Sequence, residues 1–500
     1  MFEDLESNRF ILLEGRPGCG KTTLVNKISH DWACRDVLKS KLLIHVPLRR
    51  LNDEPDRTIE TIIGVGCSTL PIGDMEDLAS DIIENQGEGV VFAFDGLDEY
   101  VPYYYDPTQP PVFDEEQPKE GTKRFLIRKI SASALLGRNK KIDDIFQILY
   151  RKNFTKALII VTSRPAACKE FRQYAGKRIE VLGFLKPQII EYVRHYFDDH
   201  KHKAQQLIAH LEQHPNLMNM AYLPLHCAML AFLYEEDTVL PETETEFYKH
   251  FTLSTLLRCI RKREGGVIPL MFFDQLPDND KVIFDKICEL AFNATVKSKQ
   301  VFTSVDVKSL LTDLASTKND VSSLGLVVID HCFTRYGLDE TYTFLHLTFQ
   351  EYLAAVHIAG LSESQRMDII KAHHKEKHLL VVWKFLCGMT DFTSASAMDA
   401  FKCLIETTKA KDKLFQLQCC HESQHSLPCT HVINASNGRV EFNGSNFTPS
   451  DCAAIGYTIK KSDYGTVDLT FNECTFSFEG ALAFLQQIDD HSTSVTLTDK

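Results

Sequence analysis

Gly15-Arg16-Pro17-Gly18-Cys19-Gly20-Lys21-Thr22 follows closely on the apolar run from Phe10 to Leu13. This spacing is typical of a nucleotide-triphosphate P-loop, in which a strand leads into a glycine-rich turn and a helix follows. The turn can bring backbone N–H groups onto the β-phosphate, and the helix N-terminus adds partial positive charge. We expect Lys21 to bridge the β- and γ-phosphates and Thr22 to hold magnesium through its hydroxyl. The predicted nucleotide contacts are these eight residues and Thr23.

The composition is that of an ordinary globular chain of 500 residues, 44% hydrophobic and 25% charged. Such a length predicts about three to five structural units. The formal charge of −13 argues against nonspecific nucleic-acid binding. The chain has 15 cysteines and no Cys-x-x-Cys pair, and it shows neither a secretory leader nor an apolar stretch of membrane-spanning length. We therefore expect a cytoplasmic protein with reduced thiols, no nucleic-acid partner and no membrane span.

A second motif is the apolar run from Val90 to Phe94, followed by Asp95-Gly96-Leu97-Asp98-Glu99. Apolar runs of this kind form the buried strands of parallel sheets, and acids at their carboxyl ends lie beside bound phosphates. We expect Asp95 to position magnesium, and Asp98 or Glu99 to polarise a water molecule against the γ-phosphate. An apolar run ending in acids is often only a strand that meets solvent, but the P-loop favours the functional interpretation.

A third predicted strand, from Ala157 to Val161, ends in Thr162-Ser163-Arg164-Pro165. Arg164 is a candidate sensor of the γ-phosphate, although an arginine after a strand is usually an ordinary surface charge. Lys41 to Val46 predicts a fourth strand. Strands that alternate with helical stretches such as Lys21 to Cys34 predict a doubly wound α/β core.

Several segments together resemble a known family. The acidic motif from Asp95 to Glu99 resembles the Walker B motif of NACHT ATPases, which belong to the signal-transducing STAND class. The resemblance continues through Val181 to Phe184, similar to the end of the NACHT core, and Tyr222 to Leu225, similar to the proline motif of the following helical domain. Segments similar to those of NOD-like receptors are Leu240 to Tyr248, the winged-helix signature from Phe344 to Ala355, Val381 to Gly388, and Leu417 to Glu422. The chain is thereby identified as a member of the NOD-like receptor family.

The resemblance assigns roles to two further residues. It implies that His346 contacts the β-phosphate of ADP and that Pro224 lies near the adenine. From the residues alone, Pro224 is a proline at a helix start, and a lone histidine beside an apolar helix is commonly a structural residue. The apolar spacing of Phe349, Tyr352, Leu353 and Val356 predicts a core-facing helix directly after His346.

The expected architecture is a P-loop NTPase with a doubly wound parallel sheet, followed by smaller domains. The boundaries are 1–183 for the NACHT domain, 184–239 for helical domain 1, 240–360 for the winged helix, 361–432 for helical domain 2, and 433–500 for partial leucine-rich repeats. In the last region Val440-Glu441-Phe442 recurs as Val467-Asp468-Leu469 and as Val495-Thr496-Leu497, with a convex helix from Ala481 to Ile488. A strand–helix cap with accidental periodicity is the alternative.

Two other segments have less specific patterns. Cys419, Cys420, His421, His425, Cys429 and His431 are zinc-ligand residue types, but their spacing fits no standard finger, and we favour a packing helix. The acidic, proline-containing stretch from Tyr103 to Thr122 is expected to be a mobile insertion.

The resemblance implies an ATP/ADP switch of an intracellular innate immune receptor. ADP holds the off state, ATP drives assembly with like chains or related receptors, and any hydrolysis is slow. The P-loop lies almost at Met1, so we expect the N-terminal effector domain, which recruits protein effectors in the family, to be missing. Two alternatives remain open: a steady-turnover P-loop ATPase or kinase, and a nucleotide-independent scaffold or decoy that co-assembles with full-length relatives.

Overall fold

The computed structural model describes residues 9–54, 57–67, 72–100, 144–164, 168, 170–236, 238, 240–241, 243–264, 272–303, 305–307, 321–334, 337–406, 413–476, 478–488 and 493–498. The chain divides into two compact units. One comprises Met1–Leu182 and His331–Asp339, and the other comprises Gly183–Asp330 and Glu340–Lys500. The stretch from Tyr103 to Thr122 lies outside the described residues.

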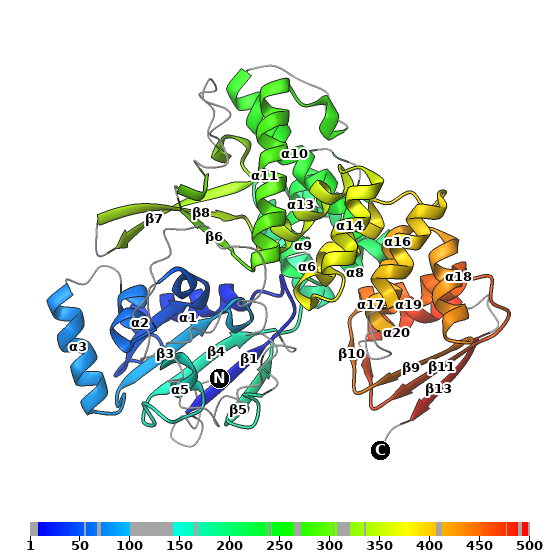
Figure 1. The fold of residues 1–500 in the computed structure, drawn as a ribbon. Coiled ribbons are helices and arrows are strands. Elements are labelled where there is room, and N and C mark those ends of the chain that lie inside the picture. Colours follow the sequence, from blue (N-terminus) through cyan, green and yellow to red (C-terminus); the bar gives the residue numbers. More distant parts are fainter. Residues whose placement is uncertain are drawn as a thin grey trace. The chain divides into compact units, whose positions relative to one another are not determined.

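The first unit is built on a five-stranded parallel sheet with the strand order β2-β3-β4-β1-β5 (Figure 1). The strands are β1 (Phe10–Glu14), β2 (Leu42–Pro47), β3 (Val90–Asp95), β4 (Leu158–Ser163) and β5 (Lys177–Glu180). All residues of β1, β3 and β4 are buried. These three central strands are covered on both faces, which explains why their sequences are continuous apolar runs.

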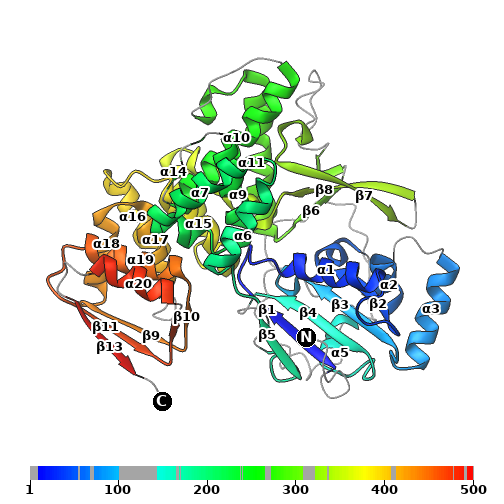
Figure 2. The same cartoon turned by 180° about the vertical axis from the view of Figure 1, so that it is seen from behind.

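Helices cover both faces of this sheet (Figure 2). On one face, Val25 of α1 (Lys21–Ala33) packs with Leu13 and Val91. On the other, α2 (Ile59–Gly66), α3 (Ile72–Glu84) and α5 (Asp144–Leu149) pack against Leu12 and Phe92. The predicted doubly wound α/β core and its first four predicted strands are therefore confirmed.

The second unit is mainly helical. Its helices up to residue 435 are α6 (Lys186–Tyr196), α7 (Lys201–Gln213), α8 (Pro215–Met220), α9 (Pro224–Glu235), α10 (Glu244–Glu264), α11 (Asp278–Lys297), α13 (Leu347–Ala359), α14 (Glu363–His373), α15 (Leu380–Gly388), α16 (Ala395–Glu406), α17 (Lys413–Ser423) and α18 (Ser426–Ala435). Between α11 and α13 in sequence come β6 (Val301–Thr303), β7 (Val327–Thr334) and β8 (Gly337–Phe344), in the sheet order β6-β8-β7. Within the described part of the chain, no helix is long and apolar enough to cross a membrane.

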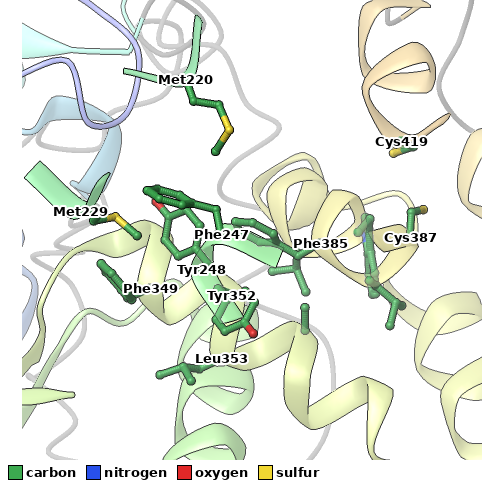
Figure 3. Packing of buried hydrophobic residues seen from close by; sticks show 14 of the residues in the cluster. Met220, Met229, Phe247, Tyr248, Phe349, Tyr352, Leu353, Phe385, Cys387 and Cys419 are labelled. Atoms are coloured by element: carbon green, nitrogen blue, oxygen red, sulfur yellow. The ribbon is translucent and has the colours of Figure 1, made fainter. Parts of the chain in front are cut away.

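An aromatic cluster joins α10, α13 and α15 (Figure 3). The ring of Tyr248 lies 5.0 Å from Phe349, 5.6 Å from Tyr352 and 5.1 Å from Phe385, measured between centroids. All four side chains are buried, as is Leu353. The core-facing helix predicted after His346 is thus confirmed, because its apolar residues meet side chains from two other helices.

The C-terminal segment repeats a strand–helix unit. Strands β9 (Arg439–Asn443), β11 (Val467–Asn472) and β13 (Thr493–Thr498) form a parallel sheet, β10 (Asn446–Phe447) pairs with β12 (Thr475–Phe476), and the helices are α19 (Pro449–Lys461) and α20 (Phe478–Ile488).

One part of the predicted repeat register was wrong. Val440 pairs with Leu469, and Leu469 pairs with Val495, so the equivalent of Val440 is Leu469 rather than Val467. A shift of two residues keeps the same alternation of inward and outward side chains, so the apolar pattern cannot detect it. The predicted domain boundaries and the leucine-rich-repeat assignment stay predictions.

Candidate nucleotide-binding site

The turn between β1 and α1 contains the predicted P-loop. Gly18 (φ 74°) and Gly20 (φ 94°) adopt left-handed backbone angles that residues with a Cβ rarely adopt. Gly15 has no room for a side chain, because a Cβ there would lie 2.8 Å from the carbonyl oxygen of Val181. The three glycines therefore fix the path of the turn. Helix α1 begins at Lys21, with Gly20 as its N-cap.

The side chain of Lys21 folds back over this turn. Its Nζ donates hydrogen bonds to the carbonyl oxygens of Gly15 (2.8 Å) and Arg16 (2.9 Å). Thr22 and Thr23 are exposed in the first turn of α1, whereas Cys19 is buried. Since charged phosphate oxygens form stronger hydrogen bonds with an ammonium than neutral carbonyl oxygens do, a phosphate in the turn would compete well for Lys21.

Asp95 ends β3 and is buried, with 8% of its surface exposed. The hydroxyl of Thr162 at the end of β4 donates to Asp95 Oδ1 at 2.5 Å, and it accepts from the backbone N–H of Gly96 at 2.8 Å. Thr162 therefore orients the carboxylate that was predicted to position magnesium. From the sequence, Thr162 was predicted only to lie at a strand end, and this role was not predicted.

Asp98 and Arg164 form a close ion pair. Arg164 Nε lies 2.7 Å from Asp98 Oδ2, and the backbone N–H of Arg164 donates to Asp98 Oδ1 at 3.0 Å. Both side chains are largely buried, with 24% of Arg164 and 11% of Asp98 exposed. The carboxylate thus engages the predicted sensor arginine through both of its oxygens, which makes Asp98 a positioning partner of Arg164.

Glu99 lies beside this pair with a different electrostatic environment. Burial raises the pKa of Glu99 to about 7, with a further increase from the negative charge of Asp98, against the opposing effect of Arg49 and Arg164. A carboxyl group whose pKa lies near neutral pH is suited to accept a proton from water. The sequence could not distinguish the two acids, but the structure does: Asp98 is paired with Arg164, whereas Glu99 has a raised pKa.

These residues converge because of the sheet topology. Strands β1, β3 and β4 are parallel and adjacent, so their carboxyl ends lie along one edge. That edge brings together the P-loop, the acids from Asp95 to Glu99, and Arg164, as expected for an open α/β sheet. Pro224 and His346, the other two predicted contacts, belong to the second unit.

Pro224 and His346 both occupy helix starts. Pro224 is the first residue of α9, where its missing N–H is tolerated. His346 is the N-cap of α13, and its Nδ1 accepts the backbone N–H of Thr348 at 3.2 Å. Because Nδ1 accepts this bond, a neutral His346 ring carries its proton on Nε2 and can donate from that atom.

A buried tyrosine, not predicted from the sequence, supports His346. Tyr248 Oη lies 2.6 Å from Thr348 Oγ1, which in turn lies 2.9 Å from His346 Nδ1. These hydrogen bonds link Tyr248, at the end of the segment from Leu240, to His346 in the winged-helix signature. The only sequence signal was that both residues fall in segments that resemble the same family.

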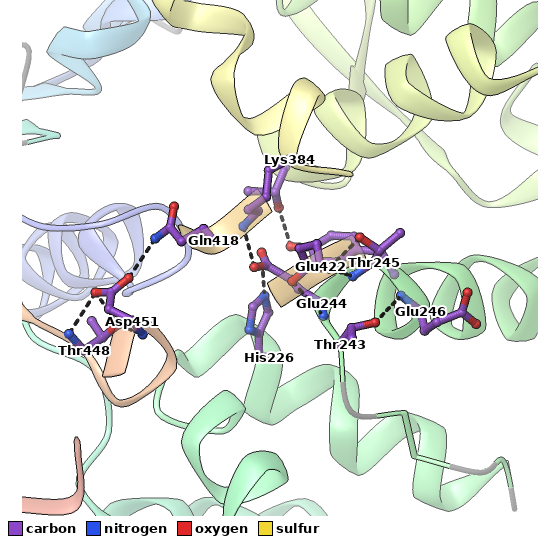
Figure 4. Close-up of polar contacts among 12 residues, drawn as sticks. His226, Thr243, Glu244, Thr245, Glu246, Lys384, Gln418, Glu422, Thr448 and Asp451 are labelled. Carbon is purple, nitrogen blue, oxygen red and sulfur yellow. Dashed lines mark hydrogen bonds and ion pairs between the residues drawn. The ribbon is translucent and has the colours of Figure 1, made fainter. Parts of the chain in front are cut away.

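A second group of buried charges lies within the helices of the second unit (Figure 4). Lys384 of α15 lies 2.5 Å from Glu244 of α10, and His226 of α9 lies 3.8 Å from the same carboxylate. Glu422 of α17 caps the start of α10, accepting from the N–H of Thr245 at 2.8 Å and from its hydroxyl at 2.6 Å. We refer to Lys384, Glu244, Glu422 and His226 as the charge cluster.

Burial and charge act in opposite directions in this cluster. Burial raises the pKa of Glu244, but Lys384 and His226 outweigh it, so that this pKa is lowered overall. Burial lowers the pKa of Lys384, but Glu244 and Glu422 raise it overall. Burial lowers the pKa of His226, which is therefore neutral at pH 7. The cluster depends on Lys384 as the cation that faces two carboxylates.

The cysteines of the candidate zinc segment lie in the hydrophobic core. Cys419, Cys420 and Cys429 are fully buried, and burial lowers the pKa of His421 to about 4. In the part of the chain that the structure describes, no group of three or more His, Cys, Asp or Glu residues has an arrangement that could hold a metal ion.

A family model matches the part of the chain that holds the candidate site. Residues 9–200 match the family model described as "NACHT domain". The matched residues span the five-stranded sheet of the first unit and the candidate nucleotide-binding site.

The relatives extend this relationship along most of the chain. It is 23% identical over 436 residues to human "NACHT, LRR and PYD domains-containing protein 12", covering 82% of this chain and 36% of that protein. It is also 23% identical over 522 residues to "Protein NLRC5" of Ictalurus punctatus, covering 94% of this chain and 28% of that protein. The chain is thus similar to these proteins over most of its own length and spans about a third of the length of each. A solved STAND protein with a tetratricopeptide repeat sensor from Pyrococcus horikoshii is 9% identical, with a TM-score of 0.32, covering 97% of this chain and 69% of that chain.

Proposed function

We propose that this chain is the ATP/ADP-dependent switch of an intracellular NOD-like innate immune receptor. The observation that supports the proposal best is the shared sheet edge, where Lys21, Asp95 and Arg164 come from three adjacent strand ends. A glycine turn with an ammonium, a buried carboxylate and a fixed guanidinium is the set of groups that a nucleoside triphosphate requires.

The nucleotide would bind through the P-loop turn. The backbone N–H groups from Gly18 to Thr23 are suited to the β-phosphate, and Lys21 would exchange its two carbonyl partners for phosphate oxygens. The hydroxyl of Thr22 and the carboxylate of Asp95 are hard oxygen donors of the kind Mg²⁺ prefers, and Thr162 already orients Asp95. Magnesium bound there would supply charge neutralisation to the phosphate oxygens.

Hydrolysis would be a slow reset of the switch. In this proposal Glu99 accepts the proton of the attacking water, because its pKa lies near neutrality. Arg164 contacts the γ-phosphate, and Asp98 holds the guanidinium until the phosphate competes for it. A guanidinium engaged in an ion pair within the site is consistent with low turnover, since each cycle must break that pair.

His346 would act as the latch of the ADP-bound state. Its Nδ1 is fixed by the N-cap bond to Thr348, so Nε2 is the atom that would donate to the β-phosphate. Pro224 at the start of α9 would lie near the adenine. ATP would shift the chain out of this ADP-bound state only by as much as ATP binds the other state more tightly than this one.

The remaining features of the proposal follow from the family. We propose a cytoplasmic protein that assembles on activation with copies of itself or with related receptor chains. Neither nucleic acid nor a membrane span is part of the proposal.

The first test is a titration of fluorescent ADP with magnesium against the purified chain. Lys21→Ala is expected to weaken binding at least about tenfold, because it removes a charge-assisted phosphate contact. Lys27→Ala is the matched control, since Lys27 lies in the same helix and pairs with Asp31 at the surface. Absence of binding by the folded, unmodified chain would contradict the switch and favour a nucleotide-independent scaffold, provided that the chain still co-purifies with a related receptor. Rapid ATP turnover would instead favour a metabolic ATPase.

A further inference from the structure

A bidentate ion pair joins Arg172 to Glu14, the residue immediately before the P-loop. Arg172 Nε donates to Glu14 Oε1 at 2.8 Å, and a second guanidinium nitrogen of Arg172 donates to Glu14 Oε2. Only 11% of the Glu14 side chain is exposed, against 34% of Arg172. Paired planar groups of this kind fix orientation as well as distance. Neither residue was among the predicted contacts, and neither lies within the P-loop motif.

Glu14 is tied to the start of the P-loop. It is the last residue of β1, and its backbone carbonyl accepts from the N–H of Val181 at 2.6 Å. The next residue, Gly15, donates its N–H to the carbonyl of Ser163 at 3.1 Å. Glu14 therefore sits where the strand under the phosphate turn joins its neighbours β4 and β5.

Arg172 belongs to the connection that begins with the sensor arginine. The carbonyl of Arg164 accepts from the Cys168 thiol at 3.4 Å, and the carbonyl of Cys168 accepts from the N–H of Phe171 at 2.9 Å. Phe171 is buried, with 1% exposed, and immediately precedes Arg172. A short series of contacts thus leads from Arg164 to the guanidinium that binds Glu14.

Arg164 and Arg172 are each held by an acidic residue. Asp98 holds Arg164 on the side of the acidic motif, and Glu14 holds Arg172 on the side of the P-loop. A change at Glu14 would reach the backbone of Arg164 through these contacts, although Glu14 itself would touch no nucleotide.

We propose that the Glu14–Arg172 pair is a positioning element for Arg164, and that it sets how strongly this site prefers a nucleoside triphosphate over a diphosphate. The inference rests on the proposed function, because it requires Arg164 to contact the γ-phosphate. Without the pair, the γ-phosphate contact weakens while the β-phosphate contacts of Lys21 and the turn remain.

The test is a double-mutant cycle on the full chain, with a fluorescent non-hydrolysable ATP analogue and fluorescent ADP. Glu14→Gln keeps the shape but removes the charge, and Arg164→Ala removes the sensor. Each single variant is expected to lower the preference for the ATP analogue about tenfold, because it removes or weakens one charged hydrogen bond to the γ-phosphate. The double variant should lower the preference no further, because both substitutions act on that same contact. Glu14→Asp keeps the charge and is expected to restore part of the preference.

The controls separate a specific change in nucleotide preference from a general loss of folding or of nucleotide binding. Lys156→Gln removes the exposed pair with Glu88 in the same unit and should leave the preference unchanged. The positioning role alone would be overturned if Glu14→Gln weakened the binding of the ATP analogue and of ADP equally. It would also be overturned if Glu14→Gln lowered the preference for the ATP analogue by the same factor with Arg164 present and with Arg164 replaced by alanine. An unchanged preference in Arg164→Ala would overturn the sensor role and this proposal with it. If Glu14→Gln does not fold, Arg172→Gln replaces it in the cycle.

Discussion

Lys384→Met should destabilise the second unit more than any loss of surface charge. Lys384 is the cation of the charge cluster, with its Nζ 2.5 Å from Glu244. Its side chain is 15% exposed and that of Glu244 is 24% exposed. Methionine preserves most of the length and apolar stem of the lysine, so the substitution removes the charge with little loss of packing.

The magnitude follows from the burial of the partners. Two unit charges about 4 Å apart attract by about 4 kcal/mol at an effective dielectric constant of about 20. Removing one partner of a buried pair costs about 3 to 5 kcal/mol, because the remaining charge is left uncompensated. Here Glu244 and Glu422 would face each other without a cation, but burial raises the pKa of Glu422 and Glu244 is 24% exposed. Proton uptake and partial solvation therefore favour the lower part of that range, about 3 kcal/mol.

The loss should depend on pH in a defined direction. Glu244 has a lowered pKa in the folded chain, so its stabilising contribution is present above the pKa of the unfolded chain and is lost as the pH falls. In Lys384→Met that lowering disappears and Glu244 can bind a proton at mildly acidic pH. The difference in the free energy of unfolding between variant and unmodified chain should therefore shrink as the pH is lowered from 8 towards 5.

Urea unfolding of both chains, followed by circular dichroism at several pH values, measures these differences. Lys402→Met is the matched control, because Lys402 pairs with Asp399 at 3.1 Å on the surface, with side chains 42% and 65% exposed. It should change the free energy of unfolding by no more than about 1 kcal/mol. A loss below about 1 kcal/mol in Lys384→Met, or a loss that grows as the pH falls, would refute the reasoning.

Four further substitutions test the site and its supports. Glu99→Gln should lower ATP hydrolysis about 100-fold or more without weakening ADP binding, and hydrolysis by the unmodified chain should rise with pH through about 7, as the carboxylate forms; a flat pH–rate profile in a phosphate-release assay would contradict this role. His346→Ala should raise the oligomeric fraction seen by light scattering while nucleotide binding persists, and an unchanged monomer would count against the latch. Tyr248→Phe removes the hydroxyl beside Thr348 and should lower the midpoint of thermal unfolding, with a loss of about 1 kcal/mol. Gly388→Ala would place a Cβ 2.1 Å from Thr245 Oγ1 and should destabilise by about 1 to 3 kcal/mol in urea, whereas Gly465→Ala, with no atom within 4 Å, should not.

Much of the nucleotide-binding unit was predictable from the sequence. Continuous apolar runs marked β1, β3 and β4 because strands buried on both faces have no polar side. The glycine spacing identified the turn, since Gly18 and Gly20 need left-handed angles there. Parallel strands then place all three motifs at one edge, so the convergence of Lys21, Asp95 and Arg164 followed from local signals.

Contacts between distant residues were not predictable in this way. The apolar pattern allowed the register of β9 and β11 to slip by two residues, because either register directs the same side chains inward. The pairs Glu14–Arg172 and Lys384–Glu244 join residues 158 and 140 positions apart, and no local periodicity links such positions.

By itself the sequence determined the phosphate-binding turn, the parallel α/β core and the candidate acids, because each depends on residues that are close in the chain. Only the tertiary structure decided the surroundings of each acid. Asp98 pairs with Arg164, whereas burial and the negative charge of Asp98 raise the pKa of Glu99 to about 7. The physical reason is that pKa values and ion pairs depend on distance and burial in space, which three consecutive letters, Leu97-Asp98-Glu99, do not encode.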